Sequence, residues 1–124
     1  MPDLILSSLP KTWIFDVDGT LVVHNGHLRS QGDEMLLGVK EVFSRISPKD
    51  TVILLTARKE TSRPQLESFL HAHGIRYDKI LFNMPVGERI LVNDKKPSGL
   101  LTAYAINKDR NASLNLNIII DQSL

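Results

Sequence analysis

The stretch TWIFDVDGTL, residues 12–21, is the most informative part of the chain. Its first four residues form a short apolar run rich in aromatic and β-branched side chains, which is typical of a buried strand. The run ends abruptly in the polar segment 16–20, which holds Asp16, Asp18 and the turn-forming Gly19. The stretch therefore predicts a buried strand followed by a tight loop that carries two carboxylates.

The remaining apolar pattern alternates between strand-like and helix-like segments. A second clear strand, residues 51–55, also ends in a polar segment, Thr56-Ala57-Arg58. Shorter apolar runs predict three more strands, at residues 79–82, 89–92 and 116–120. Helical spacing predicts three helices, over residues 38–47, between Ser62 and Gly74, and over 100–107. This alternation predicts a three-layer α/β/α Rossmann-like fold, with a central, mostly parallel sheet of about five strands.

Composition sets limits on the class of protein. With 124 residues and a mass of 13.9 kDa, we expect a single domain over residues 1–124, of which 1–10 form an N-terminal extension. The formal net charge of +1 argues against a nucleic-acid partner held by a basic face. The sequence contains no cysteine, which excludes thiol chemistry. It has no apolar run long enough for a membrane span and no signal-peptide pattern, so we expect no membrane partner and a cytoplasmic location.

Polar residues follow three of the predicted strands: Asp16 and Asp18, then Thr56, then Asn93 and Asp94. Ligands of open parallel sheets bind beyond the carboxyl ends of the strands, so neighbouring strands would bring these side chains together. Concentrated carboxylates repel one another unless a cation is present, and hard oxygen ligands suit Mg²⁺. The pattern therefore predicts a site for a phosphate ester with magnesium.

The segment Asp16–Leu21 matches the DxDGT(L/V) motif of the haloacid dehalogenase-like (HAD) phosphatase superfamily, and the chain resembles that superfamily from about residue 12 to residue 105. Thr56, which follows a strand, resembles the second motif of the superfamily. Asn93-Asp94 resembles its fourth, acidic motif, with an asparagine where an acidic residue is common. The intervals between the motifs are too short for a cap domain, so the resemblance implies a small capless member.

The resemblance implies a role for each motif residue. Asp16 would be the nucleophile and Asp18 the general acid–base. Thr56 would donate a hydrogen bond to a phosphoryl oxygen. The other residues expected at the phosphate are Gly19, Thr20, Ala57 and Arg58. The expected ligands of Mg²⁺ are the Asp16 carboxylate, the backbone carbonyl of Asp18, and Asp94 with Asn93.

The lysine of the third motif is missing from its usual place, where this chain has Met84. That lysine would neutralise the nucleophile and the phosphate. We rank Lys95 first as its replacement, ahead of Lys79 and Lys96, because it directly follows the acidic motif.

Together these features predict a magnesium-dependent hydrolase of a small phosphorylated metabolite, which by its resemblance would be a sugar phosphate. The open site also favours a homo-oligomer in which a neighbour covers the pocket. Two alternatives remain. One is a phosphate- or nucleotide-sugar-binding domain with little or no turnover, which Met84 and Asn93 favour. The other is a phosphorylatable receiver domain, which is disfavoured because both acidic residues follow the first strand.

Overall fold

The structure, a computed structural model, describes residues 3–124; Met1 and Pro2 of the expected extension lie outside the described residues. Within the described residues, the regular structure consists of five short strands, two α-helices and two 3₁₀ turns. In chain order they are β1 (Asp3–Leu6), β2 (Thr12–Asp16), η1 (Gly26–Leu28), α1 (Val39–Ser44), β3 (Thr51–Leu55), η2 (Glu60–Ser62), α2 (Arg63–Ala72), β4 (Lys79–Leu81) and β5 (Asn117–Ile120).

The strands form two parallel sheets, which confirms an α/β protein with parallel pairing. Strands β2, β3 and β4 form one sheet in that order, and β1 pairs with β5 in the other. The expected N-terminal extension therefore contains a strand: Leu4 and Leu6 of β1 are buried, and β1 lies in register with β5 from the far end of the chain. The single five-stranded sheet that we expected is thus divided into two.

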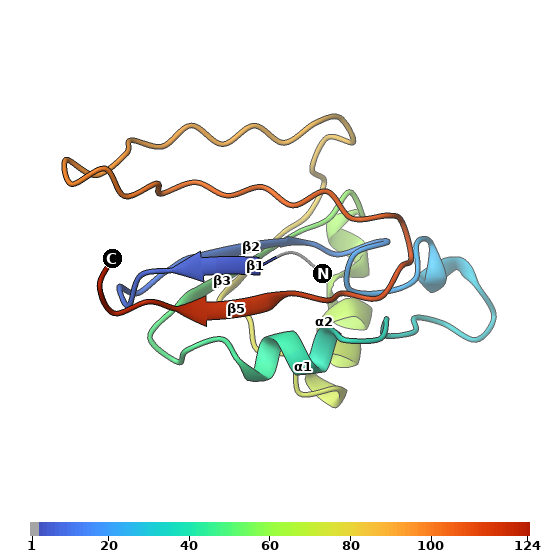
Figure 1. Ribbon diagram of the computed structural model, residues 1–124. Coiled ribbons are helices and arrows are strands. Elements are labelled where there is room, and N and C mark those ends of the chain that lie inside the picture. The colour runs from blue at the N-terminus through green and yellow to red at the C-terminus, as the bar shows by residue number, and fades with distance from the viewer. Residues whose placement is uncertain (1–2) are drawn as a thin grey trace.

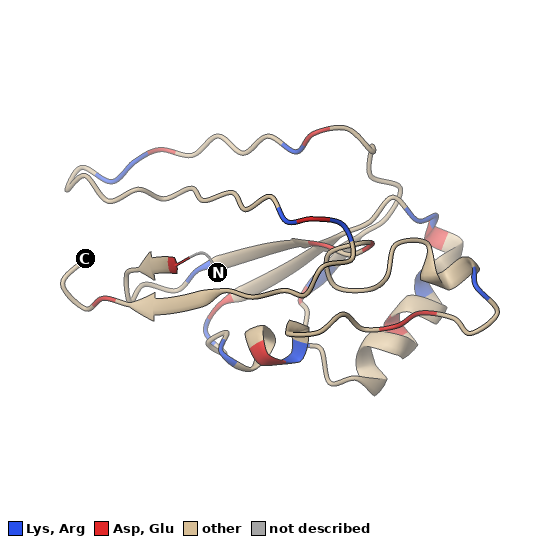
Figure 2. Ribbon diagram, turned by 45° about the vertical axis from the view of Figure 1, so that its right-hand side comes forward, with Lys and Arg blue, Asp and Glu red and all other residues tan. Residues whose placement is uncertain are grey.

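The core lies between the sheets and the two helices (Figure 1). Phe15 of β2 stacks against Phe43 of α1 with ring centroids 4.7 Å apart. Leu66 and Leu70 lie one helical turn apart on α2 and are fully buried, as the apolar spacing predicts. Figures 1 and 2 both show α1 and α2 on one side of the strands. No helix within residues 3–124 is long and apolar enough to cross a membrane.

A long extended excursion lies on the other side of the strands (Figure 1). We call residues 86–107 the arm. The sequence predicted a strand at 89–92 and a helix at 100–107 here, and both predictions are wrong: the segment has neither element. Ile90 and Val92 are 86% and 89% exposed, so the apolar run that suggested a buried strand faces solvent. The second helical layer of the expected three-layer arrangement is consequently not formed.

The arm is a hairpin whose turn follows from its sequence. The Lys96 N–H donates to the Leu100 carbonyl at 2.9 Å, and the Gly99 N–H donates to the Lys96 carbonyl at 2.8 Å. Gly99 has φ of +97°. The loop between Lys96 and Leu100 has three residues. Pro97 at its first position and Gly99 in the left-handed conformation at its third suit a hairpin loop with a G1 bulge. Pro97 and Gly99 therefore reverse the chain, and the residues after the turn continue as an extended leg.

The arm leaves the sheet because the residues after β4 are fixed to the neighbouring loop. The Asn83 N–H donates to the Arg58 carbonyl at 2.8 Å, and the Met84 N–H donates to the Thr56 carbonyl at 3.0 Å. Asn83 has φ of +59°, a left-handed conformation that asparagine tolerates better than most residues. These contacts direct the chain away from the strands before residue 86.

Gly38, at the start of α1, provides a test of this packing. It has φ of +86°, and a Cβ there would lie 2.1 Å from the backbone oxygen of Leu114. Gly38→Ala should lower the free energy of unfolding by about 2–5 kcal/mol, because backbone strain and overlap add. Gly74, which follows α2, is the matched control: its φ is +69° but nothing lies within 4 Å of its Cβ position. Gly74→Ala should cost only about 1–2 kcal/mol. Urea unfolding that gives equal losses for both variants would contradict the close approach of Leu114 to α1.

Candidate functional site

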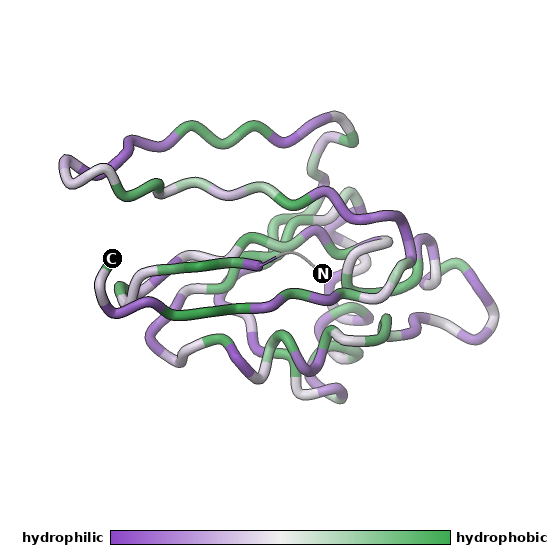
Figure 3. Tube along the Cα trace, in the orientation of Figure 1, coloured by the Kyte–Doolittle hydropathy of each residue, from purple (hydrophilic) through white to green (hydrophobic). Residues whose placement is uncertain are grey.

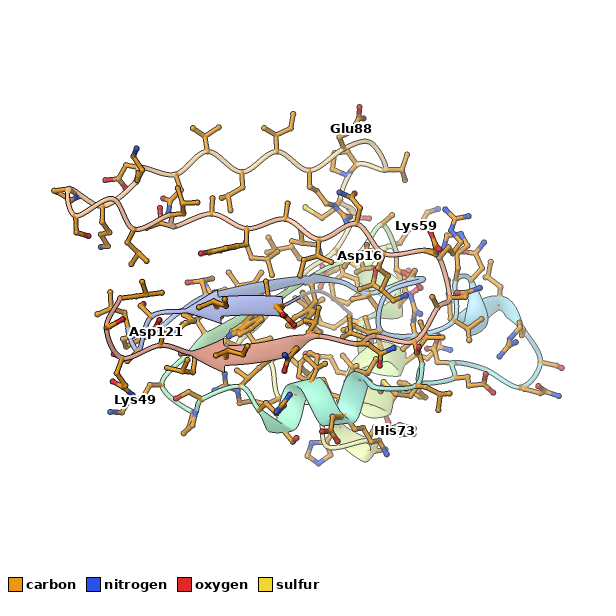
Figure 4. All side chains as sticks on the ribbon, in the orientation of Figure 1. Asp16, Lys49, Lys59, His73, Glu88 and Asp121 are labelled. Atoms are coloured by element: carbon orange, nitrogen blue, oxygen red, sulfur yellow. The ribbon has the colours of Figure 1, made fainter. Side chains whose placement is uncertain are left out.

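Asp16 and Thr56 lie together at one edge of the three-stranded sheet. Asp16 ends β2 and is level with Leu55, the last residue of β3, so Thr56 is the first residue beyond the same edge. The Thr56 N–H donates to the carbonyl of Leu81, which ends β4, at 3.0 Å. The expected convergence of these two residues on adjacent strands is therefore observed. Figure 4 labels Asp16 at this end of the strands, beneath the start of the arm.

The loop after β2 folds tightly over this edge. The Leu21 N–H donates to the Val17 carbonyl at 2.9 Å, and the Gly19 N–H donates to the Val22 carbonyl at 2.7 Å. Gly19 adopts φ of +86°, as its predicted role in a sharp turn requires. The loop thereby carries Asp18 and Thr20 back to the ends of the strands.

Both oxygens of the Asp16 carboxylate accept hydrogen bonds. Thr20 donates from Oγ1 to Oδ2 at 2.9 Å, so Thr20 braces the loop. Arg89, at the start of the arm, donates from Nη1 to Oδ1 at 2.7 Å. The side chains of Arg89 and Asp16 are 38% and 33% exposed, so this ion pair is open to water and can exchange partners.

Asp18 belongs to a second, buried cluster. Thr56 donates from Oγ1 to Asp18 Oδ2 at 2.9 Å. Arg58 donates from Nη2 to Asp18 Oδ1 at 2.8 Å and from Nε to the same oxygen at 3.1 Å. The opposite edge of the guanidinium donates to Asp33, from Nη2 at 2.7 Å and from Nη1 at 3.0 Å. Arg58 thus lies between two carboxylates, with a two-pronged contact to each.

Arg58 is therefore not available to a phosphate, which corrects its predicted role as a substrate contact. Its side chain is only 1% exposed, and that of Asp33 is 2% exposed. Burial alone would lower the pKa of Arg58, but hydrogen bonds and charges from Asp33 and Asp18 outweigh it and raise the pKa above its usual value. Thr56 likewise directs its hydroxyl to Asp18 instead of to an open phosphate position. Ala57 lies exposed between them.

Lys108 supplies a second cation at the edge, where the arm rejoins the body. Its Nζ donates to the carbonyl oxygens of Gly19 at 2.9 Å and Asp109 at 3.0 Å. Burial lowers the pKa of Lys108, and the negative charges of Asp109 and Asp16 oppose that effect. The Lys108 ammonium is therefore close enough to Asp16 for the charge of that carboxylate to affect it, and it contacts the loop that carries Asp18.

The structure does not bring Asp94 and Asn93 to Asp16, contrary to the expected acidic motif. Both lie exposed on the outgoing leg of the arm. Asn93 donates from Nδ2 to the Thr102 carbonyl at 3.2 Å, and Thr102 donates from Oγ1 to the Asp94 carbonyl, so both are tied to the opposite leg. Asp94 is five residues beyond Arg89 on an extended leg, which places it roughly 16 Å along the arm from the Asp16 ion pair. The apolar run 89–92 was expected to be a strand that ends at the same edge as β2, but the sequence pattern alone did not determine that this run joins the sheet.

The predicted lysines are not at the site either. Lys95 and Lys96 lie exposed beside the turn of the arm, beyond Asp94. Lys79 begins β4 two register positions before Leu81 and is exposed. The cations near Asp16 are instead Arg89, at the start of the arm, and Lys108, the residue that follows its last residue. Figure 2 shows charge at both ends of the arm and at its tip.

The site balances its own charge. Its carboxylates, Asp16, Asp18 and Asp33, are matched in number by its cations, Arg58, Arg89 and Lys108. Within residues 3–124 no group of three or more His, Cys, Asp or Glu side chains is placed to hold an ion. The residues therefore do not fit the magnesium site implied by the resemblance, because Asp94 and Asn93 lie on the arm, away from Asp16.

Sequence reasoning missed Asp33, Arg89 and Lys108. Asp33 follows Gly32 in an irregular segment with no motif. Arg89 was assigned to a strand, where its side chain would have alternated with buried neighbours. The sequence does offer one signal for them. Two carboxylates at a buried strand end need positively charged partners, and these must come from elsewhere in the chain.

Comparison with protein-family models, with curated proteins and with solved structures finds no match to this chain.

Asp33 tests the buried cluster. Asp33→Ala should lower the free energy of unfolding by about 3–5 kcal/mol, because it leaves half of a buried guanidinium without a partner. Glu60→Ala, which removes the exposed partner of Arg63, should leave the urea midpoint unchanged. Equal midpoints for both variants would show that Arg58 is not held as described.

Proposed function

We propose that this protein is a HAD-like phosphomonoester hydrolase in which Asp16 attacks phosphorus. The absence of a cap domain is part of the same proposal, whereas the second helical layer of the HAD fold is not formed in residues 3–124. The observation that carries it is the Asp16 carboxylate, which lies at the carboxyl edge of a parallel sheet with one oxygen fixed by Thr20 and the other paired with an exposed, exchangeable Arg89. The DxDGTL sequence that forms this loop supports the same reading.

Arg89 and Lys108 support binding of a phosphate dianion beside Asp16. Arginine forms paired hydrogen bonds with phosphate oxygens, and a partly exposed guanidinium moves from one anion to another at little cost. When Arg89 turns from Asp16 to the phosphate, it frees the nucleophilic oxygen and neutralises the incoming charge in one movement. Lys108 adds a second positive charge from the opposite end of the arm.

The reaction proceeds in two displacements. An Asp16 oxygen forms a bond to phosphorus while the bond from phosphorus to the ester oxygen breaks, and the leaving alkoxide takes a proton from water. Water then attacks the phosphorylated Asp16, releasing phosphate and restoring the carboxylate. The one-third exposure of Asp16 gives water access for both steps.

Asp18 acts in this proposal as an orienting group. The resemblance makes it a general acid, yet its oxygens accept hydrogen bonds from Arg58 and Thr56. Its contacts fix the loop between Asp16 and Thr20. Release from Arg58 would have to precede any proton transfer by Asp18.

Magnesium dependence is an expectation of the resemblance, and the donor set as arranged does not favour it. Neither displacement runs through a metal ion. The cationic function falls to Arg89 and Lys108, which suit the charge of a phosphate dianion.

A second candidate function is phosphate binding without turnover. The engagement of Asp18 by Arg58 favours it, because a fixed acceptor is a poor proton donor. An assay that measures both phosphate binding and hydrolysis separates the two functions.

Asp16→Asn should reduce hydrolysis of p-nitrophenyl phosphate by more than about 10³-fold, since it removes the nucleophile but keeps its shape. Asp94→Asn should leave the rate unchanged, because Asp94 is on the arm, away from Asp16. Initial rates should be measured with Mg²⁺ and with a chelator. An unchanged rate in Asp16→Asn contradicts the mechanism. Loss of activity in Asp94→Asn, together with chelator sensitivity, would restore the metal site that the resemblance implies. Binding of phosphate with no hydrolysis would favour the second candidate.

Arg89→Ala and Lys108→Ala should each weaken binding of inorganic phosphate by about tenfold, as expected for the loss of one charge-assisted hydrogen bond. Lys95→Ala is the matched control from the same arm and should have no effect. The contribution of Lys108 should fade as the pH rises through its lowered pKa, because only the ammonium form attracts the anion. Titration calorimetry over a pH series checks both points. Weaker binding in Lys95→Ala than in Arg89→Ala would reverse this assignment.

A further inference from the structure

A cleft of about 670 Å³ lies between the arm and the body of the protein. All five residues of β2 line it, so it runs the length of that strand, roughly 13 Å at about 3.3 Å per residue. Residues on β1 and on both legs of the arm also line it. Its volume lies within the range of small-molecule sites, about 300–1,000 Å³.

The walls of the cleft are mainly apolar. Ile14 on the body is about half exposed, although it lies in the middle of a strand. Leu91, Leu101, Tyr104 and Ile106 contribute from the arm. Figure 3 shows the apolar stretches of both legs above those of β1 and β5. A ligand that fills this space exchanges water for hydrocarbon and aromatic surface.

The end of the cleft beside Asp16 is charged and is continuous with the candidate site; Lys11, which precedes β2, and Lys96, beside the turn of the arm, also line the cleft. Asp16, Thr20 and Lys108 all line it. A phosphate beside Asp16 would therefore have its ester group directed along β2, between the strand and the arm. The same cleft thus presents a polar end for a phosphate and an apolar length for whatever the phosphate esterifies.

We propose that this cleft binds phosphate monoesters of apolar alcohols, with the phosphate at Asp16 and Lys108 and an alkyl or aryl group along β2. This inference rests on the proposed function and names its substrate class. It differs from the sugar phosphate that the resemblance implied, because the lining is mainly apolar and its polar side chains are fewer than a sugar with several hydroxyls would need as partners. Continuity with the charged end favours such a small amphipathic ligand over a second copy of the chain.

The test is the affinity of non-hydrolysable alkylphosphonates, measured by titration calorimetry on the full chain. Each methylene that enters the cleft should tighten binding by about two- to fourfold. Hexylphosphonate should therefore bind at least about 30-fold more tightly than methylphosphonate, with a negative heat-capacity change. Equal affinities for the two ligands would overturn the proposal.

Two arm variants separate the cleft from general hydrophobicity. Ile106→Asp places a charge in the cleft, whereas Val92→Asp places the same charge on the same arm at a residue that does not line it. Both positions are exposed, at 43% and 89%, so neither substitution should unfold the protein. Ile106→Asp should abolish the preference for hexylphosphonate, and Val92→Asp should retain it. Leu101→Asp provides a second cleft variant. Equal loss in the Val92 and Ile106 variants would overturn the proposal.

The cleft proposal and the hydrolase proposal can fail separately. A strong chain-length dependence without hydrolysis of any phosphate ester supports the cleft and removes the hydrolase. Hydrolysis with rates and affinities that ignore chain length overturns the cleft and keeps the hydrolase. Light scattering tests whether a second copy of the chain occupies the cleft instead. A dimer that does not bind hexylphosphonate, and that Ile106→Asp dissociates, would assign the cleft to a second copy and overturn the proposal.

Discussion

The buried guanidinium of Arg58 joins three segments that are far apart in the sequence. Asp18 comes from the loop after β2, Asp33 from the irregular segment before α1, and Arg58 from the loop after β3. Each carboxylate alone would be costly to bury, and the guanidinium satisfies both at once. The loop after β2 is therefore fixed at its middle by Asp18, and Asp16 and Thr20 on either side face the open edge of the sheet.

This arrangement divides the charges into two sets with different consequences. The Asp18–Arg58–Asp33 set is buried, so its charges are fixed in place and are unavailable to ligands. The Asp16–Arg89 pair is partly exposed, so solvent screens it and a competing anion can separate it. Chemistry at this edge is accordingly expected from the exposed pair, while the buried set provides the rigidity that positions it.

Local patterns predicted the elements that bury a continuous apolar face. Residues 12–16 and 51–55 form strands, and α2 lies within the predicted limits, because few other conformations bury those side chains. The extension was misjudged because β1 is stabilised by β5, a partner more than one hundred residues away that no local pattern reveals. Helix α1 is shorter than the predicted 38–47 and begins after Gly38, whose left-handed conformation cannot continue a helix.

The arm shows why the candidate site was predicted only in part. Residues 89–92 and 100–107 are apolar, and that property suits a buried strand, a helix or the wall of a cleft equally well. The Pro97–Gly99 turn carried the better local signal, since proline and glycine at this spacing suit a hairpin loop that reverses the chain. The motif residues of β2 were placed correctly because strand and loop are contiguous there. Asp94 was misplaced because its position depends on the direction of a segment that pairs with no strand.

The same arm links binding to the chemistry proposed at Asp16. Arg89 at its start and Lys108 directly after its end lie at the strand edge, and its inner side chains form one wall of the apolar cleft. Because backbone hydrogen bonds between its two legs are confined to the turn, the arm gains little stability from strand pairing. A ligand that fills the cleft would supply apolar contacts that the arm otherwise lacks, and its phosphate would draw Arg89 from Asp16. Ligand binding would then do two things at once: its apolar group would pack against the arm, and its phosphate would expose Asp16 by moving Arg89, which belongs to the same arm.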